Sequence, residues 1–219
     1  MKLFLFSGLH SVKNNNRLIN FSGIDNPTIT YIPSSSCSNK SKFYYEQWKK
    51  SFKKFKKVRF KYFAIDKPFS KKDLKNAFLT DILYLSGGDT ILFCKNIKQK
   101  KIDKEIFKFV KKKDKVLSGL SAGAIIMTPK LNIVKLIDKK NNEFNVSGLG
   151  LINFEVFPHY QVKQHKKIIF EYSKNNNNPI LCLSNNSVGI IEDNKISIFG
   201  KYQLINGDSI ESQFCNSII

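Results

Sequence analysis

Short apolar runs alternate along the chain with longer segments in which apolar residues recur at helical spacing. The short runs predict strands and the longer segments predict helices. Elements that alternate in this way are typical of an α/β fold in which helices cover both faces of a mostly parallel sheet. No linker rich in Pro, Gly or Ser divides the sequence, so we expect one domain over residues 1–219.

The predicted elements can be given as residue ranges. The extended runs span residues 3–6, 28–32, 58–65, 82–85, 115–117, 132–137, 154–157, 180–183, 188–191 and 196–199. The helical segments span residues 41–55, 70–78, 102–110, 122–127 and 162–172. Ser70 begins its helix with a capping pattern that Asp73 completes. Asp193 and Asn194, between the last two runs, favour a two-residue hairpin turn.

Lysine is abundant throughout the chain, which carries a formal charge of +20 and has an isoelectric point near 9.8. A basic protein invites a nucleic-acid interpretation. The lysines are scattered among Asn, Ile and Phe residues, however, and the densest basic run, residues 49–61, has apolar residues at 52, 55, 58 and 60. That spacing predicts a helix end with a solvated lysine face, followed by a strand. We therefore expect no specific nucleic-acid partner.

The chain shows no targeting or membrane signal. The apolar run after Met1 is too short for a signal peptide, and no apolar run approaches the ~20 residues of a membrane helix. The four cysteines, at positions 37, 94, 182 and 215, lack Cys-x-x-Cys spacing, so neither a disulfide framework nor a zinc site is indicated. Cys94 and Cys182 lie in apolar runs and should be core residues. We expect a soluble, cytoplasmic protein with no membrane partner.

Residues 119–123 read Gly-Leu-Ser-Ala-Gly and fit the G-x-S-x-G pattern of a nucleophile elbow. A predicted strand enters the motif and a predicted helix leaves it. A turn this tight brings the backbone close to its neighbours, so the flanking residues must be Gly or Ala. The pattern makes Ser121 a candidate nucleophile, and the Ala122 N–H a candidate donor to an oxyanion. The alternative is a small-residue turn in which Ser121 only caps the helix.

A second glycine turn, Ser-Gly-Gly-Asp-Thr at residues 86–90, also follows a strand end. Two glycines allow the backbone to approach a ligand and to present N–H groups to an anion. The motif lacks the Lys-Ser/Thr of a phosphate loop, which disfavours nucleotide binding. The alternative is an ordinary turn in which Asp89 or Thr90 caps the next helix.

Only three histidines could serve as a general base. His10 follows the first strand. His165 lies in a lysine-rich helical segment and should be solvated. His159 lies just beyond an apolar strand, where open α/β sheets place their sites, and Pro158 rules out a regular helix there. We therefore favour His159 as the base, against the alternative of a hydrogen-bonded loop histidine.

In their order along the chain, these motifs resemble the peptidase E family of aspartyl dipeptidases, serine peptidase family S51. That family belongs to the class I glutamine-amidotransferase-like group, which also contains cyanophycinases. The resemblance spans most of the chain and implies flavodoxin-like α/β layering and a serine hydrolase that needs no metal or cofactor. It further implies that Ser121 is the nucleophile, that His159 is the base, and that the Gly88 and Ala122 amides form the oxyanion hole.

The sequence departs from the family pattern at the third member of the triad. The family has Asp or Glu in a strand-end segment that corresponds to residues 183–187, and here Asn185 takes that place. An amide can orient a histidine but cannot neutralise an imidazolium. Three outcomes follow: Asn185 is a weak orienter, a carboxylate such as Asp138 reaches in from the segment after the elbow, or activity is reduced or lost.

A second departure concerns specificity. The family's preference for an N-terminal aspartate relies on an arginine in the helix after the histidine, and residues 161–167 contain none. Lys163, His165 or Lys167 could bind the substrate carboxylate as point charges, without the bidentate fork of arginine. Asp89 is a further candidate for substrate contact.

Together with these motifs, the resemblance implies a serine exopeptidase for short peptides, preferably dipeptides with N-terminal aspartate, and a homodimer is possible. Rival interpretations are a related peptidase of other specificity, including cyanophycinase-like action on an aspartate-rich polymer, and a catalytically weakened binding protein on the same scaffold.

Overall fold

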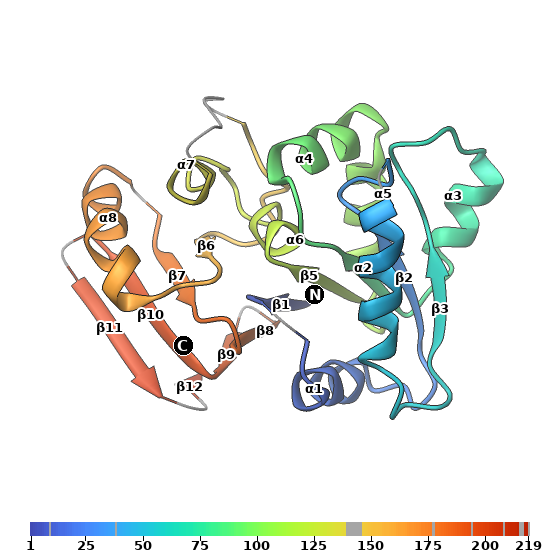
Figure 1. The fold of residues 1–219 in the computed structure, drawn as a ribbon, viewed down its shortest axis with the longest axis horizontal. Coiled ribbons are helices and arrows are strands. Elements are labelled where there is room, and N and C mark those ends of the chain that lie inside the picture. The colour runs from blue at the N-terminus through green and yellow to red at the C-terminus, as the bar shows by residue number, and fades with distance from the viewer. Residues whose placement is uncertain are drawn as a thin grey trace.

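The computed structural model describes residues 1–8, 10–37, 39–138, 146–176, 178–193, 195–207, 209–214 and 217–218, which form two β-sheets with helices packed against them (Figure 1). The strands of the eight-stranded sheet, in spatial order, are β12 (Ser217–Ile218), β9 (Lys195–Phe199), β8 (Val188–Glu192), β1 (Lys2–Phe6), β5 (Val116–Leu120), β4 (Ile82–Leu85), β2 (Thr28–Ile32) and β3 (Arg59–Tyr62). The strands of the four-stranded sheet are β11 (Ser209–Phe214), β10 (Lys201–Asn206), β7 (Ile180–Leu183) and β6 (Glu155–Phe157).

The centre of the large sheet is parallel. β1 pairs with β5, β5 with β4, β4 with β2, and β2 with β3, all in parallel register, whereas β8, β9 and β12 continue the sheet in antiparallel fashion. The α/β class and the mostly parallel central sheet are therefore confirmed. Because the parallel strands end at one edge, the loops that follow β1, β2, β4 and β5 converge there.

Eight helices complete the described fold. They are α1 (Val12–Ser22), α2 (Asn39–Lys50), α3 (Lys71–Phe78), α4 (Thr90–Gln99), α5 (Ile102–Val110), α6 (Ala122–Ile125), α7 (Val134–Ile137) and α8 (Val162–Lys174). Side chains of α1 and α2 pack on one face of the large sheet, and side chains of α4, α5 and α6 pack on the other. Helices thus cover both faces, as the alternating pattern predicts.

Strand alternation gives these two faces different side chains. In β1, Phe4 and Phe6 point to the α1/α2 face, whereas Leu3 and Leu5 point to the opposite face. The α1/α2 face forms an aromatic core that also contains Tyr31, Trp48, Phe52 and Tyr84. The other face is mainly aliphatic. The cysteines predicted for the core, Cys94 and Cys182, are fully buried there.

Several local predictions hold. Ser70 and Asp73 form the capping box expected at the start of α3. The ranges expected for β2, β4 and β7 match the observed strands. Asn194, in the expected hairpin turn between β8 and β9, lies outside the described residues.

Other local predictions are wrong. Residues 132–137, expected to be extended, contain the short helix α7, because a brief apolar run does not distinguish a buried strand from a helical turn. The helix expected over residues 41–55 ends at Lys50, and the following residues form turns that still bury Phe52. The strands β10 and β11 and the helix α1 were not predicted from the pattern.

Candidate active site

The turn that joins β5 to α6 has the geometry of a nucleophile elbow. Ser121 has φ 49° and ψ −105°, a backbone conformation that L-residues rarely adopt and that is strained. Its neighbours must be small: a Cβ on Gly119 would lie 2.3 Å from the Gly123 carbonyl oxygen, and one on Gly123 would lie 2.2 Å from Leu85 O. The sequence expectation that close approach requires small flanking residues is therefore confirmed.

The elbow is held by its own backbone. The Ser121 N–H donates to Phe6 O at 2.9 Å, and the Gly123 N–H donates to Ser86 O at 3.1 Å. The elbow is thereby tied to β1 on one side and to the second glycine turn on the other. The Ala122 N–H between them belongs to the first residue of α6, so it has no acceptor within the helix.

His159 and Ser121 are in direct hydrogen-bond contact. His159 Nε2 lies 2.9 Å from Ser121 Oγ, and His159 Nδ1 lies 2.6 Å from Asn185 Oδ1. An amide oxygen only accepts, so Nδ1 carries the proton and Nε2 is left as the acceptor for the serine hydroxyl. The structure thus joins Asn185, His159 and Ser121 in one chain of hydrogen bonds, in which the imidazole tautomer is suited to remove the serine proton.

A buried serine holds the histidine loop in place. Ser7, at the end of β1, accepts a hydrogen bond from the His159 N–H at 2.8 Å, and its hydroxyl donates to Leu183 O at 2.7 Å. His159 itself has φ 56°, so its backbone is held in the left-handed region by its surroundings. At Gly8, the next residue, a Cβ would lie 2.8 Å from both the backbone and side-chain oxygens of Asn185. Glycine there leaves room for the amide.

The other expected third member, Asp138, is an exposed residue that directly follows α7. The His159 ring nitrogen that faces away from Ser121 is hydrogen-bonded to the side-chain oxygen of Asn185. Glu155, the acid nearest to His159 in sequence, is buried and bonded elsewhere: it accepts from the Tyr172 hydroxyl and from Asn176 Nδ2, both at 2.9 Å. Burial raises the pKa of Glu155, and these two hydrogen bonds oppose the rise.

Gly88 lies in the second glycine turn and lines the same cavity as Ser121. Its φ of 135° requires glycine, and a Cβ there would lie only 2.0 Å from Ser34 Oγ. Asp89 is the helix cap that the alternative interpretation of this turn predicts. Its exposed side chain accepts from the Leu92 N–H at 2.9 Å and caps α4. It is not among the residues that line the cavity.

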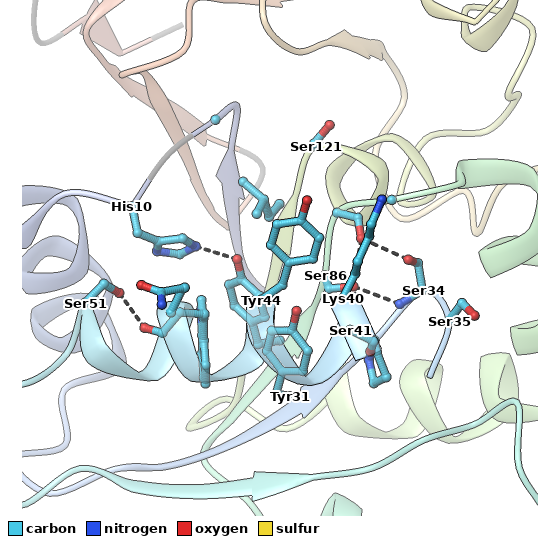
Figure 2. Close-up of a pocket in the computed structure, with 18 of the residues that line it drawn as sticks. His10, Tyr31, Ser34, Ser35, Lys40, Ser41, Tyr44, Ser51, Ser86 and Ser121 are labelled. Atoms are coloured by element: carbon cyan, nitrogen blue, oxygen red, sulfur yellow. Dashed lines mark hydrogen bonds between the residues drawn. The ribbon is translucent and has the colours of Figure 1, made fainter. Parts of the chain in front are cut away.

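The cavity beside Ser121 has a volume of about 830 Å³ and lies between α2 and the carboxyl ends of the parallel strands. Ser121, His159 and Asn185 all line it. Figure 2 shows Lys40 and Tyr44 directed from α2 toward the space below Ser121, with His10 beyond one end of this row and Ser34 and Ser35 beyond the other. None of the described lining residues is acidic, and Lys40 is the only Lys or Arg among them.

The cations expected to contact substrate lie elsewhere. Lys163 is exposed on α8 and does not line the cavity. His165, expected to be solvated, is half-buried: its Nδ1 accepts from the Gln161 N–H at 3.0 Å, and its ring packs 5.1 Å from that of Phe157. Burial lowers the pKa of His165, and nearby His159 lowers it further. His165 therefore stabilises the start of α8.

Sequence reasoning missed most of the cavity wall. His10, Tyr31, Lys40 and Tyr84 line it, but they come from one loop and three elements that only the fold brings together. The one available signal was the helical spacing of Tyr44 and Trp48, which indicated a buried face and did not indicate that this face borders a cavity.

The sequence profile of Peptidase family S51 matches residues 3–199. This chain belongs to that family. An uncharacterized peptidase of Listeria innocua is 29% identical over 164 residues, covering 70% of this chain and 76% of that protein. An uncharacterized peptidase of Pasteurella multocida is 29% identical over 189 residues, covering 78% of this chain and 85% of its relative.

Solved structures share the fold of this S51 member. One, assigned to peptidase E from Listeria monocytogenes, has a TM-score of 0.68 at 24% identity and covers 97% of this chain and 98% of its own. A peptidase from an acI-B1 Actinobacterium has a TM-score of 0.74 at 15% identity, covering 100% and 96%. Within the described residues, no helix is long and apolar enough to cross a membrane.

Proposed function

We propose that this S51 peptidase is a serine exopeptidase that hydrolyses short peptides through an acyl-enzyme. The observation that carries the proposal is the chain of hydrogen bonds from Asn185 through His159 to Ser121, with distances of 2.6 and 2.9 Å. The strained elbow under Ser121 supports it, because strain of this kind persists where the surroundings impose it and occurs frequently at active sites.

The proposed reaction has two acyl transfers. Ser121 Oγ bonds to the carbonyl carbon of the substrate while its proton moves to His159 Nε2. The C–N bond then breaks, and the leaving amine takes the proton from His159. Water next attacks the acyl-enzyme and gives a proton to His159. The ester bond breaks, the carboxylic acid leaves, and the proton returns to Ser121 Oγ.

The oxyanion formed in each step needs preorganised donors. We propose the amides of Gly88 and Ala122 for this role. The Ala122 N–H has no acceptor in its own helix, and its two neighbours in the elbow are already bonded. Gly88 lies on the strand end next to the elbow, where the conformation and the nearby Ser34 hydroxyl exclude a side chain.

For the substrate, we retain the preference for an N-terminal aspartate that the resemblance to peptidase E implies. The charge of the cavity supports it, because the described wall contains one lysine and no carboxylate. Lys40, rather than Lys163 or His165, is then the point charge that attracts the substrate carboxylate. A peptidase of other specificity, including one with cyanophycinase-like action, would share the same acyl-transfer groups.

One observation favours a second candidate, a catalytically weakened binding protein. Asn185 orients His159 but cannot neutralise the imidazolium that forms when Ser121 loses its proton. On this alternative the cavity would bind peptides and the serine would turn over slowly or not at all.

The deciding experiment combines a dipeptide panel with an active-site-directed fluorophosphonate, applied to the wild type and to Ser121→Ala. A serine peptidase hydrolyses at least one dipeptide and is labelled at Ser121, and both signals disappear in Ser121→Ala. Hydrolysis that persists in Ser121→Ala would contradict the assignment of the nucleophile. Peptide binding without labelling or hydrolysis would support the binding protein.

A further inference from the structure

One face of α2 forms a wall of the cavity along its length. Lys40, Tyr44 and Trp48 recur at intervals of four residues, so they stack along one side of the helix. Tyr44 is 61% exposed although it is a large ring, whereas Trp48, one turn further on, is only 5% exposed. The wall therefore runs from an open end near Lys40 and Tyr44 to a closed end at Trp48.

The closed end of the cavity is a cluster of rings, which we call the aromatic floor: His10, Tyr31, Trp48 and Tyr84. Trp48 lies 4.8 Å from both Tyr31 and Tyr84, measured between ring centroids, and Tyr31 stacks on Tyr84 at 5.5 Å. The His10 ring lies 5.4 Å from Tyr84. Separations of this size are those of favourable offset and edge-to-face aromatic pairs, so the floor is a packed surface that exists before any ligand binds.

The polar atoms of the floor are largely satisfied by one another. Asn15 Nδ2 donates to Ser51 O, which leaves Asn15 Oδ1 to accept from His10 Nδ1–H at 2.8 Å. His10 Nε2 then accepts from the Tyr84 hydroxyl at 2.5 Å. The buried indole N–H of Trp48 is an exception, with no acceptor among the described residues. Tyr84 is fully buried and Tyr31 and Trp48 are each 5% exposed, so a ligand at the floor meets only the edges of these rings that border the cavity, together with the half-buried His10 ring.

The two ends of the cavity differ in chemistry. Ser34 and Ser86 lie at the end near Lys40, where the Ser34 N–H donates to Ser86 Oγ at 2.8 Å and the Ser34 hydroxyl donates to Gly87 O at 2.9 Å. The total volume of about 830 Å³ lies near the upper end of the range for small-molecule sites. A side chain as small as that of aspartate, bound near Lys40, does not fill the end of the cavity that borders the aromatic floor.

We infer that the aromatic floor, with Tyr44 beside it, is a specificity subsite for an aromatic side chain of the substrate. The preferred substrate is therefore a short peptide with an aromatic residue next to the scissile bond, in addition to any acidic group that Lys40 binds. This inference deepens the proposed function and rests on it, because only a peptidase would have such a peptide as its substrate. Binding of an aromatic dipeptide can nevertheless be measured without hydrolysis.

Intrinsic fluorescence gives that measurement, because Trp48 is the only tryptophan in the chain and forms part of the floor. Ser121→Ala protein is titrated with Asp-Phe, Phe-Ala and Asp-Ala while Trp48 is excited selectively. We expect saturable changes with the ring-containing dipeptides and binding at least about tenfold weaker for Asp-Ala, as burial of one ring between Tyr44 and the floor would give. Equal affinity for all three, or no change with any of them, would overturn the inference.

The position of the ring follows from the same panel. A preference for Asp-Phe over Asp-Ala assigns the floor to the leaving residue, and a preference for Phe-Ala assigns it to the acyl residue. Either result supports the subsite. If ring-containing dipeptides bind tightly and the wild type hydrolyses none of the panel, the subsite stands and the proposed function fails. If the wild type hydrolyses Asp-Ala as efficiently as the aromatic dipeptides, the proposed function stands and the subsite fails.

A matched pair of variants tests the wall. Tyr44→Ala removes the ring beside the floor. Phe43→Ala removes an equally exposed ring from the preceding position of α2, and Phe43 does not line the cavity. We expect Tyr44→Ala to reduce the preference for the aromatic dipeptide by about threefold to tenfold. Phe43→Ala should leave the preference unchanged. Identical behaviour of the two variants would contradict the role of this wall.

Discussion

On the face of the large sheet that carries α4, α5 and α6, the strands contribute leucines such as Leu5, Leu85 and Leu117, all fully buried. On the face that carries α1 and α2, the same strands contribute Phe6 and Tyr84, which join a cluster of rings. The aliphatic face closes behind the elbow, where Gly123 packs directly on Leu85 O. The aromatic face continues into the floor of the cavity in front of it.

This difference indicates that the two faces of the sheet have different roles. Branched aliphatic side chains fill space without voids, which suits the side that fixes Ser121 in a strained conformation. Flat rings pack at defined separations, which suits the side that forms the rigid end of the cavity. Changes at the proposed catalytic groups between the faces should affect kcat, changes on the aliphatic face should affect stability alone, and changes at the cavity on the aromatic face should also affect substrate preference.

The largest expected effect is at the proposed base. His159→Asn should fold, because asparagine tolerates the left-handed φ of this position, but should lower kcat by at least about 10³-fold, since triad members act as a unit. His165→Ala is the control from the same segment and should retain kcat within a few fold. Steady-state kinetics on the best dipeptide decides this, and similar kcat values for the two variants would remove His159 from the mechanism.

The next effect concerns the amide that orients His159. An amide in place of the acid costs about 10⁴ in kcat in a well-studied serine protease. Asn185→Asp should therefore raise kcat, by tenfold or more, with little change in KM, because the carboxylate can stabilise the imidazolium. A decrease in kcat in a folded Asn185→Asp protein would show that the amide is the functional group at this position.

Stability should distinguish the two faces. Leu117→Ala on the aliphatic face should lower the free energy of unfolding by about 2–5 kcal/mol through lost burial and a cavity. Tyr44→Ala on the aromatic side should change it by less than about 1 kcal/mol, because the ring is mostly exposed. Urea unfolding measures both. A large loss for Tyr44→Ala would mean that this ring belongs to the core.

The pH dependence of stability should report the aromatic floor. Burial lowers the pKa of His10 from 6.5 to about 4, and its hydrogen bond to Asn15 opposes the shift. Between these values the unfolded state binds a proton that the folded state does not, so stability falls as pH drops from about 6.5 to about 4. The full shift corresponds to about 3 kcal/mol, and the effect should be smaller because part of the ring faces the cavity.

The control for this pH effect is His10→Gln, which should make the unfolding profile shallower over the same window. His165, whose pKa is also lowered by burial, contributes part of the slope that remains. The carboxylates with lowered pKa, including Asp66 and Asp81, do not interfere. The stability that these two carboxylates contribute is present above their usual pKa of 3.8 and is lost as the pH falls below it. If stability falls between pH 6.5 and 4 as steeply in His10→Gln as in the wild type, His10 is not the source of the pH dependence.

The smallest expected effect is at Lys40. Lys40→Met should raise KM for an aspartyl dipeptide by about threefold to fivefold, the usual strength of an exposed charge pair, and added salt should weaken the difference. Lys42→Met, also exposed on α2 but away from the cavity, should have no such effect. Equal KM values for the two variants would exclude Lys40 as the carboxylate anchor.

The elbow and the position of the histidine could be predicted from sequence because their constraints are local. Gly119 and Gly123 are required by contacts within a few residues or on the neighbouring strand, and Pro158 marks the end of β6. The tight contact between His159 and Ser121 agrees with the expectation drawn from strand ends.

The cavity and the second sheet could not be predicted in the same way. His10 and Trp48 look like ordinary buried residues, and only the packing of α2 over the strand ends turns them into a cavity floor. Half or more of the residues in β10 and β11 are polar, β10 pairs with β7, about twenty residues earlier in the chain, and β11 pairs with β10. α1 contains three consecutive asparagines, so its helical pattern is weak.

Ser7 shows when the proposed active site can be completed during protein synthesis. Its N–H donates to Ser187 O at 3.2 Å, and its hydroxyl joins the His159 loop to Leu183. A nascent chain that has grown only through α6 already carries Ser7 and Ser121, but it lacks His159, Asn185 and Leu183. Contacts between residues this distant in sequence form late. An incomplete chain on the ribosome therefore carries the serine without the hydrogen-bonded groups that would activate it.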